Sequence, residues 1–145
     1  MATETVLKSI PHRPPFLFVD SVEALDDAHI ITKREIRADE DFFQGHYPGN
    51  PIMPGVLLCE AVFQSAAIFI VKHLEDGCDV LEGKTPVLAR ILEAKFKQMV
   101  RPGDVVTIEV TPKEVLKNFH FMQGKIRNES GKLVLAIEFA LTLVA

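Results

Sequence analysis

The chain has 145 residues, 48% of them hydrophobic, and a net charge of −4, which is the composition of one globular domain able to bury a core. The acidic balance argues against nucleic acid as the main partner, because phosphate binding needs a basic excess. The N-terminal segment lacks a signal-peptide pattern, and no apolar run reaches the roughly 18 to 20 residues of a membrane span. Cys59 and Cys78 form neither a disulfide framework nor a metal-ligand spacing, so a reducing cytoplasm is expected.

Two strands are expected near the N-terminus, over residues 16–25 and 28–37. A loop rich in proline and glycine follows, and it leads into a helix from about Pro54 to Leu74. After a polar connection, four further strands are expected within residues 87–100, 105–115, 118–128 and 133–144, with turns at RPGD and ESGK. The early part of 87–100 also fits a helix, because it contains Leu, Ala and Glu.

The connections between the later strands are short, which indicates antiparallel neighbours. A helix that is apolar on nearly every face must be covered on most sides. The sequence therefore predicts a single α+β domain over residues 1–145, in which a bent antiparallel sheet wraps around one long central helix.

Polar residues are rare in that helix. Between Val56 and Val71 only Glu60, Gln64 and Ser65 are polar, and the four-residue spacing puts Glu60 and Gln64 on one face. A buried carboxyl without a charged partner keeps its proton, because burial raises its pKa. Alternatively, Glu60 emerges at a rim and is solvated, and the helix pattern alone fits both interpretations.

The loop before the helix adds two further groups. Pro54-Gly55 at the helix start leaves backbone N–H groups free, where a carbonyl oxygen that gains negative charge can bind. His46 stands at the other end of this loop, and a lone loop histidine is more often structural than catalytic. An imidazole, a buried carboxyl and a helix N-terminus in one segment are nevertheless the parts needed to remove a proton beside a carbonyl.

The pattern of His46, Pro51, Pro54-Gly55 and Glu60 resembles that of the FabZ-type (3R)-hydroxyacyl-acyl-carrier-protein dehydratases. The segments IPHRPPFLFVD and KFKQMVRPGD are also similar to this family. The resemblance implies a hot-dog fold and a homodimer, commonly assembled into a trimer of dimers. It also implies an active site at the dimer interface, with the histidine from one subunit and the glutamate from the other.

The resemblance assigns roles to individual residues. His46 is expected to remove the α-proton of a 3-hydroxyacyl thioester, the Gly55 N–H to bind the thioester carbonyl, and Glu60 to help the hydroxyl leave as water. Gln64 is expected to orient Glu60, and the carbonyl of Ile52 to fix the tautomer of the imidazole. The product is a trans-2-enoyl thioester of fatty-acid biosynthesis. No metal or redox cofactor is expected, because the thioester already acidifies the α-carbon.

Basic residues after the helix and three further histidines lie outside this motif. Lys95, Lys97 and Arg101 alternate, as on one face of a strand, and they form either a solvated face or a docking patch for an acidic acyl carrier protein. His12, His73 and His120 are given no catalytic role. Pro14 stands where the family usually has an aromatic residue, and the family's tunnel-gating tyrosine has no match.

Three other functions compete with the dehydratase hypothesis. A related hot-dog enzyme could act on another thioester, such as a coenzyme A ester or the carrier of a secondary-metabolite pathway, and the motif does not separate these substrates. A non-catalytic acyl-binding module is a second alternative, against which the presence of both His46 and Glu60 speaks. A thioesterase fits less well, because the loop and helix suit elimination.

Overall fold

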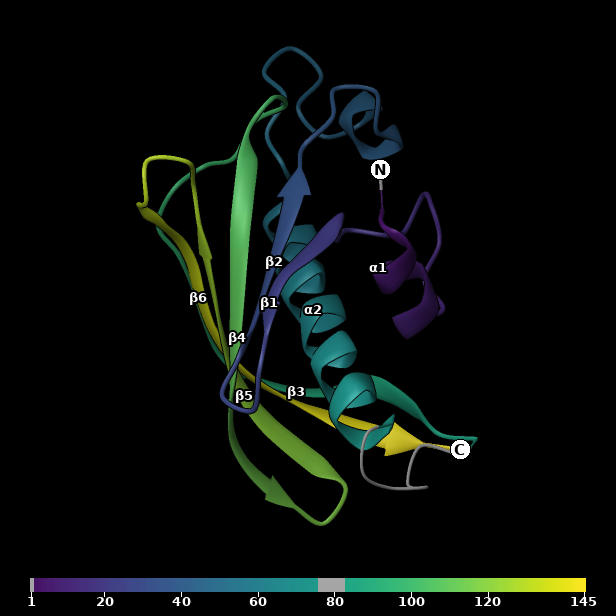
Figure 1. Cartoon of the computed structure of the whole chain (residues 1–145). Coiled ribbons are helices and arrows are strands. Elements are labelled where there is room, and N and C mark those ends of the chain that lie inside the picture. Colours follow the sequence, from purple (N-terminus) through teal and green to yellow (C-terminus); the bar gives the residue numbers. More distant parts are fainter. Residues whose placement is uncertain (1, 76–82) are drawn as a thin grey trace.

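A long helix lies along the concave face of an antiparallel sheet in the computed structural model, which describes residues 2–75 and 83–145 (Figure 1). The helix, α2, runs Gly55–Glu75. Within the described residues the sheet has six strands in the order β1-β2-β4-β5-β6-β3, and all neighbouring pairs are antiparallel. The strands are β1 (Ser21–Leu25), β2 (Ile30–Glu35), β3 (Thr85–Phe96), β4 (Val105–Leu116), β5 (Phe119–Arg127) and β6 (Leu133–Val144).

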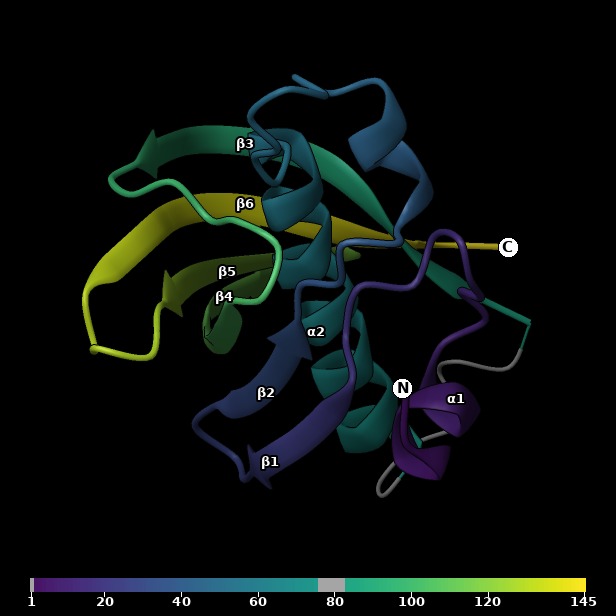
Figure 2. The ribbon, with the colours of Figure 1, turned by 90° about the horizontal axis from the view of Figure 1, so that it is seen from above.

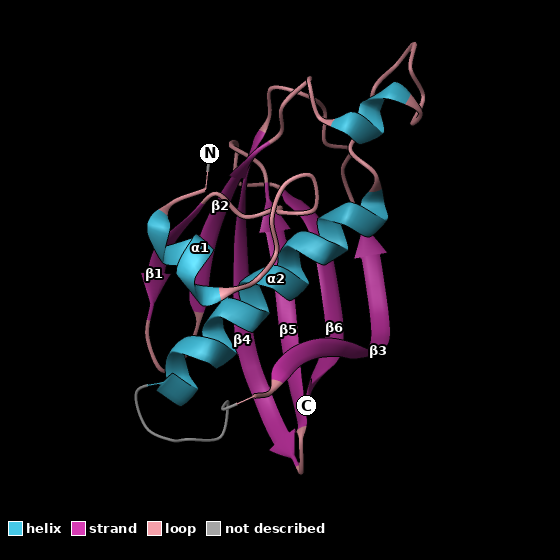
Figure 3. Cartoon of the chain, turned by 90° about the vertical axis from the view of Figure 1, so that its right-hand side faces the viewer, coloured by secondary structure: helices cyan, strands magenta, loops and turns pink. Residues whose placement is uncertain are grey.

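The sheet curls around α2, as the view from above shows (Figure 2). A short helix, α1 (Glu4–Ser9), packs against α2 on the side that faces away from the sheet (Figure 3). The central helix is therefore covered from both sides, and the predicted α+β architecture is confirmed.

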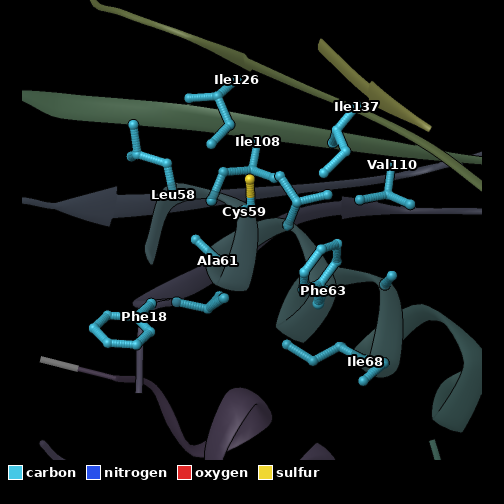
Figure 4. Close-up of a cluster of buried hydrophobic side chains, with 14 of the residues drawn as sticks. Phe18, Leu58, Cys59, Ala61, Phe63, Ile68, Ile108, Val110, Ile126 and Ile137 are labelled. Atoms are coloured by element: carbon cyan, nitrogen blue, oxygen red, sulfur yellow. The ribbon is translucent and has the colours of Figure 1, made fainter. Parts of the chain in front are cut away.

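The core lies between α2 and the concave face of the sheet (Figure 4). Side chains of α2 such as Leu58 and Phe63 point toward Ile108 of β4 and Ile137 of β6 (Figure 4). A helix this long and apolar could cross a membrane by length and composition alone, but 67% of its most apolar window is buried inside the fold. The apolarity of α2 is thus explained by its place in the core.

The predicted helix and most of the predicted strands agree with the structure to within a few residues. The segment 87–100 forms a strand, so its helical alternative is wrong. The prediction for residues 16–25 is right only from Ser21 onward. The N–H of Phe18 donates instead to the side chain of Gln64 at 2.8 Å, so a helix residue replaces a strand partner there.

Three further differences concern local structure. Neither α1 nor the 3₁₀ helix η1 (Asp41–Gln44) was predicted. The prediction that Lys95, Lys97 and Arg101 lie on one strand face is wrong, because β3 ends at Phe96 and Lys97 and Arg101 lie beyond its end. Cys59 is buried as a small apolar residue, whereas Cys78 lies outside the described residues.

Candidate active site

The loop that carries His46 is fixed by backbone contacts at both ends. The N–H of His46 donates to the carbonyl of Phe42 in η1 at 3.0 Å. The N–H of Met53 donates to the carbonyl of Val100 at 2.7 Å, which ties the end of the loop to the segment after β3. Pro48 and Pro51 fix φ between these anchors, and Pro54 follows the second one. The loop therefore holds its histidine in one position relative to α2.

The imidazole of His46 is half-buried, and its Nδ1 lies 2.8 Å from the carbonyl oxygen of Ile52. A carbonyl oxygen can only accept, so Nδ1 carries the hydrogen and Nε2 of the neutral ring has a free lone pair. The ring of Tyr47 stands edge-on to the imidazole with centroids 4.7 Å apart. The predicted contact between Ile52 and the histidine is present, and it leaves Nε2 able to act as a base.

Gly55 is the first residue of α2, and the first turn of the helix follows it directly. The N–H groups of Leu57 and Leu58 both point back to the carbonyl of Pro54, whereas the N–H of Gly55 has no acceptor within the helix. A Cβ on Gly55 would lie 2.9 Å from Cε1 of Phe96, so only glycine fits here without moving that ring. The close approach keeps the helix N-terminus next to the end of β3.

Glu60 lies one turn further along α2 and is held by Gln64. The Nε2 of Gln64 donates to Oε1 of Glu60 at 3.1 Å, and the Gln64 side chain is fully buried. The Glu60 side chain is 22% exposed, so it is neither fully buried nor at a solvated rim. Burial raises the pKa of Glu60 above its ordinary value, while the hydrogen bond from Gln64 and the nearby His12 partly oppose that rise. The surroundings therefore favour the neutral, proton-carrying form of this carboxyl.

Sequence reasoning missed His12, which lies beside Glu60. Its Nε2 is 3.7 Å from Oε1 of Glu60. Both side chains line a cavity of about 190 Å³, together with Phe63, Gln64, Ala67, Pro86, Val87, Leu88 and Leu141. The available signal was the His-Arg pair in a segment that is otherwise apolar and rich in proline.

The other histidines lie elsewhere. His73, near the end of α2, and His120, on β5, line a separate apolar cavity of about 200 Å³. Burial lowers the pKa of His120. Neither residue is among those that line the Glu60 cavity.

The candidate base and the candidate acid have different neighbours within one protomer. His46 contacts Ile52 and Tyr47, whereas Glu60 contacts Gln64 and His12. In the described part of a single chain, His46 and Glu60 form no ion pair within 4.0 Å. Within one protomer the two groups are therefore not in direct contact.

The three predicted docking cations differ in their surroundings. Lys95 is exposed and lies 3.4 Å from Glu93. Lys97 is exposed and follows the end of β3. The guanidinium of Arg101 donates to Oδ1 of Asn50 at 2.6 Å, so this residue also anchors the loop of His46. That anchoring contact was not predicted from the sequence.

Known structures share the fold of this chain at low sequence identity. The dehydratase heterocomplex ApeI:P from Xenorhabdus doucetiae matches 97% of this chain and 91% of its own chain with a TM-score of 0.79 and 16% identity. The Escherichia coli PaaI protein from the phenylacetic acid degradation operon matches 84% of this chain and 81% of its own with a TM-score of 0.64 and 15% identity. Likeness at this level establishes the hot-dog fold alone.

Sequence relatives are closer. A family model described as a FabA-like domain matches residues 10–138. The 3-hydroxyacyl-[acyl-carrier-protein] dehydratase FabZ of Oenococcus oeni is 44% identical over 112 residues, which is 77% of this chain and 77% of that protein. The FabZ proteins of Lactobacillus helveticus and Fusobacterium nucleatum are 40% and 41% identical and cover 86% and 83% of this chain, and 79% and 82% of their own length. The chain therefore belongs to the FabA-like family, among the 3-hydroxyacyl-acyl-carrier-protein dehydratases of the FabZ type.

Proposed function

We propose that this chain dehydrates (3R)-3-hydroxyacyl-acyl-carrier-protein to trans-2-enoyl-acyl-carrier-protein in fatty-acid biosynthesis, with His46 as base and Glu60 as acid. The FabZ relatives are hydro-lyases that act on acyl groups held by a carrier protein. The observations that support the roles are the hydrogen bond of His46 and the burial of Glu60. The Ile52 carbonyl leaves Nε2 of His46 with a free lone pair, and burial favours the neutral carboxyl of Glu60.

The chemistry needs both groups on one substrate. Nε2 of His46 takes the α-proton, and the electron pair of that C–H bond moves toward the thioester carbonyl, whose oxygen the Gly55 N–H stabilises. The C3–O bond then breaks while Glu60 gives its proton to the leaving hydroxyl, which departs as water. The electron pair closes the C2=C3 double bond, and the thioester supplies the acidity of the α-carbon.

In this proposal a second copy of the chain completes each site, so that His46 of one subunit acts together with Glu60 of the other. The strand β3 is the last strand of the sheet, and it pairs only with β6 in the described residues. It exposes the apolar side chains of Val87, Leu88, Ile91, Leu92 and Phe96, which are 38–52% exposed. An unpaired edge with this much exposed apolar surface is typical of an interface. The chain therefore forms a homodimer with two shared sites in this proposal, and three such dimers form a trimer of dimers.

Basic residues near the end of β3 are the proposed docking surface for the carrier protein. Lys95 and Lys97 place positive charge next to the end of β3, where they are suited to an acidic carrier protein. Phe96 adjoins these lysines and also touches the start of α2, so a carrier docked there would lie close to the helix N-terminus. We place the reaction in the cytoplasm, with the other steps of carrier-linked synthesis.

The test is enoyl formation from 3-hydroxyacyl-carrier substrates of several chain lengths. We expect product with the wild-type chain, and a loss of roughly 100-fold or more for His46→Ala and Glu60→Ala, because one base or donor supplies a few kcal/mol of barrier. Mixing the two inactive variants under subunit exchange should restore about a quarter of the activity, since half of the dimers are mixed and one of their two sites is intact.

The outcomes separate the parts of the proposal. No enoyl product from the wild-type chain would refute the dehydratase function. Turnover by wild type without recovery on mixing would place both groups in one subunit and refute the shared site. Coenzyme A esters of the same acyl groups, assayed in parallel, establish whether the carrier protein contributes to recognition.

A further inference from the structure

His12 differs from a histidine that only supports the fold. A structural histidine normally uses both ring nitrogens in hydrogen bonds. In the described residues, the Nδ1 of His12 is buried without a hydrogen-bond partner. Its Nε2 lies 3.7 Å from Glu60, which is beyond hydrogen-bond distance. The imidazole is therefore next to the candidate acid without being fixed there by its own hydrogen bonds.

The backbone around His12 is nevertheless held firmly. The guanidinium of Arg13 donates to the carbonyls of Leu7, Ile10 and His12 at 2.8, 2.9 and 2.6 Å. Four residues after His12, the carbonyl of Phe16 accepts a hydrogen bond from Gln64 at 3.2 Å. A rigid backbone with an unanchored ring keeps His12 within one small rotation of the carboxyl.

The proposed reaction leaves Glu60 without a proton at the end of each turnover. Gln64 is an amide and cannot supply one, although it donates a hydrogen bond to the carboxyl. The walls that β3 and β6 contribute to the cavity are apolar: Pro86, Val87, Leu88 and Leu141. The Glu60 side chain is 22% exposed within one protomer, and His12, which is 27% exposed, lies 3.7 Å from it and also reaches solvent. An imidazole can also take up and release a proton near neutral pH.

We propose that His12 returns a proton to Glu60 after each turnover and so resets the acid for the next dehydration. This role rests on the proposed function of Glu60. The N–H bond of a protonated His12 at Nε2 breaks, its electron pair stays on the nitrogen, and the proton forms the O–H bond of the Glu60 carboxyl. Neutral His12 then takes a proton from solvent, while protonated His46 releases the α-proton to solvent. His12 acts through Glu60 and is a positioning residue.

The other groups that affect titration here are few in the described part of the chain. On α2, Cys59 is adjacent to Glu60, and burial raises the pKa of its thiol. Arg13 donates to backbone carbonyls, and the residues of β3 and β6 that line the cavity carry no charge. In the proposed dimer, the partner subunit's His46 also faces Glu60. A change in the titration of Glu60 on replacing His12 can therefore be assigned to the imidazole.

The test compares His12→Gln with His29→Gln. His29 is a matched control, because its side chain is 30% exposed and lies 3.7 and 3.4 Å from the carboxylates of Asp26 and Glu109, away from the cavity. Carbon-13 NMR of the side-chain carboxyls, with the Glu60 signal assigned by Glu60→Gln, gives the titration midpoint. We expect His12→Gln to move the Glu60 midpoint upward by about half a pH unit or more, and His29→Gln to leave it unchanged.

Kinetics test the proton return itself. At saturating substrate, kcat of His12→Gln should fall about tenfold with little change in KM, and added imidazole should restore kcat in His12→Ala but not in Glu60→Ala. A midpoint shift without loss of kcat would overturn the proposal, and so would loss of kcat without a shift and without rescue. If His12→Ala does not fold, His12→Gln decides alone. A wild-type chain without dehydratase activity would instead refute the proposed function, while the NMR titration still reports the contact.

Discussion

Gln64 and Glu60 lie one helical turn apart on α2 and share a hydrogen bond of 3.1 Å. The same amide accepts from the N–H of Phe18 at 2.8 Å and donates to the carbonyl of Phe16 at 3.2 Å. Gln64 therefore satisfies the backbone of a segment that has no strand partner and also holds the candidate acid. The stability of the N-terminal segment and the orientation of the carboxyl depend on one buried side chain.

Replacing Gln64 with leucine should destabilise the fold and impair the acid together. The substitution leaves the N–H of Phe18 buried without a partner, which should cost about 1–3 kcal/mol of unfolding free energy, and it also removes the donor to the carbonyl of the more exposed Phe16. It also removes a hydrogen bond that lowers the pKa of Glu60, so that pKa should rise further. Urea unfolding and kcat measure the two effects.

Ser65→Ala is the control for this prediction, because Ser65 is also buried and is hydrogen-bonded to Thr32 at 2.8 Å. It should lose about 1 kcal/mol of stability and retain its kcat. Equal kcat in the Gln64 and Ser65 variants would contradict the orienting role of Gln64.

The buried carboxyl of Glu60 should make stability depend on pH. Burial raises its pKa above 4.5 in the folded chain, so the folded state holds this proton more tightly than the unfolded state does. The stabilising contribution is complete below the unfolded pKa and is lost as pH rises through the folded pKa. Glu60→Gln lacks this titration and should gain stability relative to wild type as pH rises from about 4 to about 8. Urea midpoints of both proteins that change in parallel would show that Glu60 does not titrate in this way.

The sequence predicts those features that depend on neighbouring residues. Pro54-Gly55 marks the start of the helix, and an apolar run continues to its end, so the predicted bounds differ from Gly55–Glu75 by one residue at each end. Residues 16–20 were mispredicted as strand because the backbone of Phe16 and Phe18 pairs with Gln64, a helix side chain 46 residues from Phe18. A contact between residues so far apart in sequence depends on the tertiary fold, and no local sequence pattern predicts it.

In the candidate site too, contacts between residues close in sequence could be predicted, whereas contacts that depend on the tertiary fold could not. The contact between His46 and Ile52 spans six residues and that between Glu60 and Gln64 spans four, so both could be predicted from the motif. His12 reaches Glu60 only because α1 and the segment after it pack against α2. The hydrogen bond from Arg101 to Asn50 joins residues 51 positions apart, so it also depends on the tertiary fold and was not predicted.

Gly55→Ala should affect activity more than stability. The added methyl would lie 2.9 Å from Cε1 of Phe96, which is at the far end of that side chain and can shift without moving the backbone. The cost should stay below about 1 kcal/mol, while the methyl narrows the approach to the helix N-terminus and lowers kcat. Gly124→Ala is the contrasting variant, because its Cβ would lie 2.3 Å from Cγ1 of buried Val62. It should lose about 1–3 kcal/mol or more by urea unfolding. Full kcat in Gly55→Ala would count against the proposed carbonyl site.

The edge strand β3 should hold the proposed dimer together. Ile91 is 50% exposed there, so Ile91→Lys places a charge on the apolar surface that a second copy would cover. Sedimentation velocity should show a shift toward monomer, with loss of activity because the shared site is broken. Leu116→Lys is the control, since Leu116 is 53% exposed at the end of β4 and should leave the dimer intact. A dimeric, active Ile91→Lys would place the interface elsewhere.

Carrier docking through the basic residues at the end of β3 can be separated from fold and chemistry. Reversing the charge in Lys95→Glu should lower kcat/KM for a carrier-linked substrate about tenfold at low salt, and the loss should shrink as salt screens the attraction. The same variant should leave kcat/KM for the matching coenzyme A or pantetheine ester unchanged, because those substrates lack the acidic surface of the carrier. Lys33→Glu is a matched control, since Lys33 and Lys95 each lie 3.4 Å from a glutamate and are 49% and 58% exposed. Equal losses in the two variants, or losses that salt does not alter, would mean that the carrier binds another face.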